Sequence, residues 1–140
     1  MSALTVLLVE DNPGDAVLFR EALQATGLPA TVDLVQRGDD AIRFLRRQER
    51  FREAPRPDVI VLDLDMPARN GRDVLAEVAG DPALNTIPIA ILTTSTSDAC
   101  VVGLYPGGRC VYFTKTCEFS RLQDIVRQIA AHAGTTRASA

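Results

Sequence analysis

The sequence predicts a doubly wound α/β domain, in which a single parallel sheet carries helices on both faces. Two observations predict it: short apolar runs recur five times, and a segment of helical character follows each run. A nearly continuous apolar run is typical of a strand that is buried on both faces of a parallel sheet. Strands that alternate with helices across short connections favour this architecture over separate layers of strands and helices.

The strands are expected where apolar runs interrupt the polar sequence. The clearest run is Val-Ile-Val-Leu at residues 59–62, which follows a polar loop that contains prolines. The five expected strands cover residues 4–9, 31–35, 59–62, 87–92 and 110–114.

The helices have recognisable ends in the sequence. Asn12 is a typical N-cap, Pro13 is tolerated at the first helical position, and Gly27 ends this first helix. Acidic residues lead the second helix and arginines trail it, as the helix dipole favours. Pro106 predicts a short or irregular fourth helix, because proline disfavours a helical conformation in the preceding Tyr105. The later helices are expected at residues 39–48, 71–79, 98–105 and 118–133.

Length and composition fit one globular domain. The chain has 140 residues, of which 46% are hydrophobic and 24% are charged, an ordinary balance for a folded protein. Five strand–helix units use the chain as far as Ala133. We therefore expect one domain over residues 1–133, no output domain, and a flexible tail over residues 134–140.

Several protein classes are excluded by the same features. The longest early apolar stretch, residues 6–9, is far too short to span a bilayer, and no signal peptide is recognisable. We therefore expect a cytoplasmic protein without a membrane partner. The net charge of −3 gives no reason to expect nucleic acid. The three cysteines have no CxxC spacing, so we expect free thiols rather than a zinc site.

Acidic side chains follow two of the expected strands. Glu10 and Asp11 come directly after the first strand, and Asp63 and Asp65 come at the end of the third. In a doubly wound sheet, ligands bind outside the carboxyl ends of the strands, where the strand order reverses. If the first and third strands are neighbours, these carboxylates converge, and their mutual repulsion raises their pKa values unless a cation neutralises them. Hard oxygen ligands around an open crevice suit Mg²⁺.

Two further side chains complete a site for phosphoryl transfer at this edge. Thr93 follows the apolar run of the fourth strand, and Lys115 ends the fifth. A hydroxyl, an ammonium group and a metal can position and neutralise a phosphoryl group. Asp15 and two other acidic residues, Asp39 and Asp40, fit the ordinary preference of acidic residues for helix starts.

The order of these residues resembles a known family, the receiver domains of bacterial two-component response regulators. The resemblance covers residues 4–133. It is carried by Glu10-Asp11, Asp63-Leu64-Asp65-Met66-Pro67, Gly71, Thr93-Thr94 and Lys115. Three longer segments, at residues 9–15, 70–77 and 81–95, are similar to the single-domain regulators that are paired with phytochrome-type histidine kinases.

The resemblance implies a flavodoxin-like receiver fold with strand order 2-1-3-4-5, and a role for each candidate residue. Asp63 would accept the phosphoryl group from a kinase phosphohistidine, and Thr93 and Lys115 would contact it. Such a phosphoacceptor catalyses its own phosphotransfer and dephosphorylates slowly, and is not an enzyme in the ordinary sense. The residues that would hold Mg²⁺ are Asp11, Asp63 and the backbone carbonyl of Asp65, with Glu10 acting through water. Tyr112 would be the aromatic whose rotamer reports the phosphorylation state.

The same resemblance implies the partners. They are a histidine kinase, in this subfamily a phytochrome-type photoreceptor, and a downstream phosphorelay protein or a second copy of the chain. The apolar stripe of the last helix could serve as a homodimer face, although most of it must pack on the sheet. The stripe consists of Leu122, Ile125, Val126 and Ile129.

The chain departs from the family after Lys115, where Thr116 replaces the usual proline and its cis peptide bond. A non-proline cis bond costs about 2.5–4 kcal/mol, so either that strain is retained or the loop turns differently. The reach of Lys115 therefore has to be established. The 106–108 segment could likewise alter the face that the fourth helix, fifth strand and fifth helix form in many receivers.

Two other functions compete with a phosphoacceptor. The Asp63-Leu64-Asp65 triplet resembles the DxD motif of aspartate-nucleophile phosphatases, but that motif usually sits on the first strand, and the chain lacks room for their cap domain. A receiver-like adaptor that has lost phosphotransfer is the other alternative. The intact acidic residues argue against it, while Thr116 and the 106–108 segment argue weakly for it.

Overall fold

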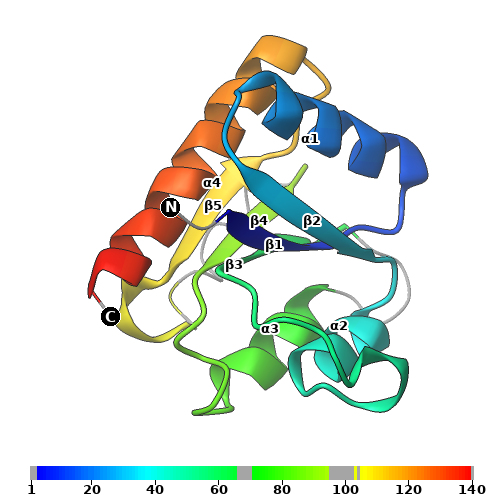
Figure 1. Ribbon diagram of the computed structural model, residues 1–140, viewed down its shortest axis with the longest axis vertical. Coiled ribbons are helices and arrows are strands. Elements are labelled where there is room, and N and C mark those ends of the chain that lie inside the picture. The colour runs from blue at the N-terminus through cyan, green and yellow to red at the C-terminus, as the bar shows by residue number, and fades with distance from the viewer. Residues whose placement is uncertain (1–2, 66–70, 95–102, 104, 140) are drawn as a thin grey trace.

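Aliphatic and β-branched residues build the sheet at the centre of the protein. The computed structural model describes residues 3–65, 71–94, 103 and 105–139, with the backbone alone for 135–139. The strands are β1 (Leu4–Val9), β2 (Ala30–Val35), β3 (Val59–Asp63), β4 (Ile89–Thr93) and β5 (Cys110–Thr114). They pair in parallel in the order β2-β1-β3-β4-β5 (Figure 1). The predicted fold class and strand order are confirmed.

Helices cover both faces of this sheet. On one face α1 packs against α4, and on the other α2 packs against α3 (Figure 1). The connections that the structure describes include two single-turn 3₁₀ helices, η1 and η3. The bounds are α1 (Pro13–Ala25), α2 (Gly38–Leu45), η1 (Glu49–Phe51), α3 (Gly71–Ala79), η3 (Pro106–Gly108) and α4 (Phe119–Ser139).

The core has two halves because side chains alternate between the faces of each strand. In β1, Leu7 and Val9 join the half beneath α2 and α3, whereas Val6 and Leu8 join the half beneath α1 and α4. All five residues of β3 are buried. This double burial fixes the register of the sheet, and the register in turn brings the ends of β1 and β3 to the same edge.

Local signals at two helix ends are confirmed. The Asn12 side chain accepts a hydrogen bond from the Asp15 amide at 3.1 Å, so it caps α1 as predicted. Tyr105 is extended, with φ −103° and ψ 134°, as expected before Pro106. Apart from Gly103 and Tyr105, the expected helix at 98–105 lies outside the described residues.

Three predicted boundaries were wrong. The helix expected at 39–48 ends at Leu45, because Arg47 adopts the left-handed region at φ 54° and breaks the helical backbone. The strand expected from residue 87 begins at Ile89, after Pro88, which has no N–H to donate to a neighbouring strand. The helix expected to end at Ala133 continues through Gly134 to Ser139, where we expected a tail. A single glycine inside a helix costs only about 1 kcal/mol and does not end it.

The expectations about membrane-spanning helices and about free cysteines can be compared with the described residues. Within them, no helix has both the length and the apolar composition that crossing a bilayer requires. Cys110 is buried and Cys117 is exposed, and both are free thiols, as predicted; Cys100 lies outside the described residues.

Candidate functional site

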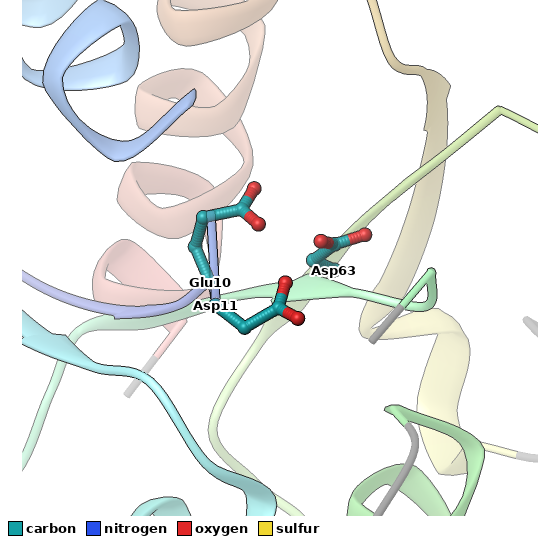
Figure 2. Close-up of side chains that lie close together, drawn as sticks. All are labelled: Glu10, Asp11 and Asp63. Carbon is teal, nitrogen blue, oxygen red and sulfur yellow. The ribbon is translucent and has the colours of Figure 1, made fainter. Parts of the chain in front are cut away.

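Three carboxylates meet where β1 and β3 end. Glu10 and Asp11 follow β1 directly, Asp63 is the last residue of β3, and Val9 pairs with Leu62 in the register between these strands. Each of the three side chains offers an oxygen, and these oxygens all lie within 4.8 Å of one another. Figure 2 shows the carboxylates of Asp11 and Asp63 directed toward each other, with Glu10 beside them. The convergence expected from the sequence is therefore present.

Two of these carboxylates are deeply buried. Asp63 is 2% exposed and Glu10 is 3% exposed, while Asp11 is more accessible. Burial raises the pKa of Glu10 from 4.5 to about 8; the Asp63 carboxylate adds to the rise and Lys115 opposes it. Without a metal, Glu10 therefore carries a proton near neutral pH. A cation that binds here would displace that proton.

Lys115 is the cation that the chain itself supplies. Its Nζ lies 3.0 Å from Glu10 Oε1, 2.9 Å from Asp15 Oδ2 and 3.0 Å from Asp63 Oδ2. Burial disfavours the charge, but the hydrogen bonds to Asp15, Glu10 and Asp63 outweigh it and raise the pKa of Lys115 above its usual value. Lys115 therefore stays protonated and offsets part of the negative charge.

The side chain of Lys115 therefore reaches the carboxylates even though Thr116, and not proline, follows it. None of the described residues is joined by a cis peptide bond. The amide of Lys115 donates to the Thr93 carbonyl at 2.8 Å, which holds the residue at the sheet edge.

Asp15 lies at a helix start as expected, and it also contacts the lysine of the site. It lies in the first turn of α1, three residues after the Asn12 cap, and its carboxylate contacts Lys115. The signal that could have found it is its place in the first turn of the helix that leaves the acidic end of β1.

Asp65 joins the ends of β3 and β4. Its amide donates to Asp63 Oδ1 at 2.8 Å. Its carboxylate accepts two hydrogen bonds, from the Thr93 hydroxyl at 3.1 Å and from the Thr94 amide at 3.0 Å. Thr93 is fully buried. The sequence pointed to the Asp65 backbone carbonyl alone and missed this side chain, because contacts between two loops do not show in local patterns.

Gly71 lets the start of α3 approach the end of β3. A Cβ at this position would lie 2.6 Å from the Asp63 carbonyl oxygen and 2.9 Å from Leu64 Cα. Both neighbours are backbone atoms, so neither can move without moving the end of β3. Only glycine allows this approach.

Tyr112 lies on β5, away from the carboxylates. It pairs with Ile91 of β4, and its ring packs partly buried against the core half beneath α2 and α3. Its hydroxyl lies 3.5 Å from Thr114 Oγ1. Tyr112 therefore lies on the strand next to the one that ends in Thr93. A switch that couples the two residues would have to act between these adjacent strands.

The donor set fits a divalent cation. Glu10, Asp11 and Asp63 supply hard oxygen ligands from the ends of two adjacent strands, and the more accessible Asp11 leaves one side for water. Magnesium usually keeps several waters and takes only a few protein ligands, which matches this arrangement.

The apolar stripe of α4 is committed to the core. Leu122, Val126 and Ile129 are buried beneath the helix, and Ile125 is packed partly buried beside them. This stripe therefore cannot serve as the face of a homodimer.

Known proteins resemble the whole of this architecture. The sequence profile of the Response regulator receiver domain matches residues 6–127. Response regulator Rcp1 of Synechocystis is 36% identical over 124 residues, which are 89% of this chain and 84% of that protein.

Two solved structures are similar over nearly the full length. The phosphorylated cyanobacterial phytochrome response regulator RcpA superimposes with a TM-score of 0.83 at 38% identity, covering 96% of both chains. The Mn²⁺-bound form of Rcp1 gives a TM-score of 0.78 at 34% identity, covering 91% of this chain and 92% of that one.

Proposed function

The chain belongs to the response regulator receiver domain family, and we propose that Asp63 is the residue that accepts the phosphoryl group from a histidine kinase. One observation carries the proposal. The Asp63 carboxylate ends the central strand β3, with the Lys115 ammonium on Oδ2 and the Asp65 amide on Oδ1. A carboxylate held in this way is aimed and partly neutralised before the donor arrives.

The chemistry is a displacement at phosphorus. An Asp63 oxygen forms the new P–O bond while the P–N bond to the donor histidine breaks, and the histidine leaves with the electron pair. A bound Mg²⁺, held by Asp11, Asp63 and the Asp65 carbonyl with Glu10 through water, would neutralise charge on the phosphoryl oxygens. Lys115 supplies a second positive charge, and Thr93 offers a hydroxyl from the end of β4. The domain thus catalyses its own phosphorylation. Slow attack of water on phosphorus then breaks the P–O bond to Asp63, which releases inorganic phosphate and restores the carboxylate.

Phosphorylation would act by shifting populations. The aspartyl phosphate recruits Thr93 and Lys115, and a modification changes an equilibrium only through contacts that differ between the two states. Tyr112, on the strand beside Thr93, would follow that movement. The readout would be a changed affinity for a partner protein, either a further phosphorelay protein or a second copy of the chain.

The kinase partner is proposed to be a phytochrome-type histidine kinase in the cytoplasm. Support comes from the similarity to RcpA, which is itself a phytochrome response regulator. Transfer can be measured by mixing the chain with autophosphorylated kinases of phytochrome and other types. Transfer that is fastest from the phytochrome type supports the pairing, and equal or slower transfer overturns it.

Acceptance at Asp63 is tested without any kinase. Incubation with acetyl phosphate and Mg²⁺ should add the mass of one phosphoryl group to the wild type and to Asp65→Asn, but not to Asp63→Asn. An equal gain of mass in Asp63→Asn would refute the assignment.

A further inference from the structure

The Asp65 carboxylate holds both hydrogen-bond donors at the end of β4. Its Oδ1 accepts from the Thr93 hydroxyl at 3.1 Å, and its Oδ2 accepts from the Thr94 amide at 3.0 Å. The same residue is tied to the acceptor, because its amide donates to Asp63 Oδ1 at 2.8 Å. One side chain therefore connects the acceptor loop to the loop that carries the threonines.

We propose that the Asp65 carboxylate is a latch that holds the end of β4 in the unphosphorylated position and lowers the affinity of the site for a phosphoryl group. The inference rests on the proposed function of Asp63, and it assigns a role to the Asp65 side chain as distinct from its backbone carbonyl. Asp65 acts here as a positioning residue, through Thr93 and Thr94.

The latch follows from the number of protons available. A hydroxyl donates one hydrogen, and an amide N–H donates one hydrogen. While Thr93 and Thr94 donate to Asp65, the same hydrogens cannot bind a phosphoryl oxygen. Thr93 is fully buried, so its hydroxyl needs a partner within the protein in either state.

Charge makes the competition strong. A carboxylate and a phosphoryl group are both anions that attract the same donors, and hydrogen bonds to charged groups are stronger than neutral ones. The amide of Asp65 donates to Asp63 Oδ1, so the carboxylate of the same residue is a second negative charge near the place where the phosphoryl group would arrive. Both effects favour the unphosphorylated state, so removing the carboxylate should favour the phosphorylated one.

The test uses beryllium fluoride with Mg²⁺ as a phosphoryl analogue that binds the acceptor carboxylate reversibly. Its affinity is measured by titration calorimetry for the wild type, Asp65→Ala and Asp65→Asn. We expect Asp65→Ala to bind the analogue about 10- to 100-fold more tightly than the wild type, the worth of one charged hydrogen bond. Asp65→Asn, which keeps an acceptor oxygen but loses the charge, should lie between them. Unchanged or weaker binding by both variants overturns the latch.

A double-mutant cycle separates the latch from a general effect of charge or folding. In a Thr93→Val background, the gain from Asp65→Ala should shrink by at least about threefold, because the competing hydroxyl is gone. An undiminished gain contradicts the latch. Asp124→Ala removes an equal charge from an exposed site on α4 and should leave the affinity unchanged; a gain equal to that of Asp65→Ala would reduce the effect to net charge and overturn the latch.

Failure of the latch can be told apart from failure of the proposed acceptor. Asp63→Asn should abolish binding of the analogue. If Asp63→Asn still binds, the acceptor assignment fails, and with it the latch. If Asp63→Asn does not bind but the Asp65 variants match the wild type, the latch alone fails.

Discussion

The ammonium of Lys115 lies 3.0 Å from Asp63 Oδ2, and the same nitrogen contacts Glu10 and Asp15. One lysine thus contacts two of the three carboxylates that would surround a divalent cation. In the absence of metal it stabilises the cluster, and on metal binding it becomes a competitor. Lys115 should therefore affect stability and metal affinity in opposite directions.

Replacing Lys115 with methionine should lower the free energy of unfolding of the metal-free protein by about 2–4 kcal/mol, because the buried carboxylates lose their cation. The same variant should bind Mg²⁺ roughly tenfold more tightly, since the competing charge is gone. Urea unfolding in EDTA and titration calorimetry measure the two effects. A variant that loses both stability and Mg²⁺ affinity would contradict the competition.

Glu10 should make the metal-free protein less stable as the pH rises. Its folded pKa of about 8 exceeds its ordinary value of 4.5, so the folded state holds a proton that the unfolded chain releases. The contribution is complete below pH 4.5 and is lost as the pH rises through 8, with a slope of at most about 1.4 kcal/mol per pH unit.

Thermal unfolding in EDTA between pH 5.5 and 8.5 measures this slope. In Glu10→Gln the group cannot titrate, so the fall in Tm across this range should be smaller by several degrees, at about 3–5 °C per kcal/mol for a chain of this size. Parallel curves for the wild type and Glu10→Gln would contradict the raised pKa.

Asp11→Asn separates metal binding from the lysine network. Asp11 is one of the three clustered carboxylates, whereas the contacts of Lys115 run to Glu10, Asp15 and Asp63. The variant should lose at least about tenfold in Mg²⁺ affinity, the cost of one charged ligand, while its Tm in EDTA stays within a few degrees of the wild type. A normal Mg²⁺ affinity would show that the metal binds elsewhere.

Gly71→Ala should destabilise the protein by about 1–3 kcal/mol, because the new methyl group meets the backbone of Asp63 and Leu64. The matched control is Gly134→Ala in α4, where a Cβ meets nothing within 4 Å. That change should be neutral or stabilising by up to about 1 kcal/mol. Equal effects of the two substitutions on urea unfolding would mean that the approach of α3 to Asp63 is not tight.

The parts that local sequence determines were predictable. The apolar runs predicted the sheet, and Asn12 with Pro13 marked the start of α1. Once the strand order is known, parallel strands bring Glu10, Asp11 and Asp63 to one edge, so the centre of the site follows from the fold.

The parts that depend on contacts between loops were not predictable. Asp15 resembles any acidic residue in a first helical turn, and only the position of the β5 end shows that Lys115 reaches it. The hydrogen bond between Asp65 and Thr93 joins residues that are 28 positions apart. The early end of α2 reflects a left-handed Arg47, a conformation that arginine does not signal.

Locating the phosphoryl group on the chain tests the central claim most directly. An aspartyl phosphate is an acyl phosphate, and borohydride reduces it to homoserine, which peptide mass spectrometry then places in the sequence. After treatment with acetyl phosphate and Mg²⁺, we predict homoserine at position 63. Homoserine at position 11 or 65 with Asp63 unchanged, or none in a protein that gained the phosphoryl mass, would contradict Asp63 as the acceptor.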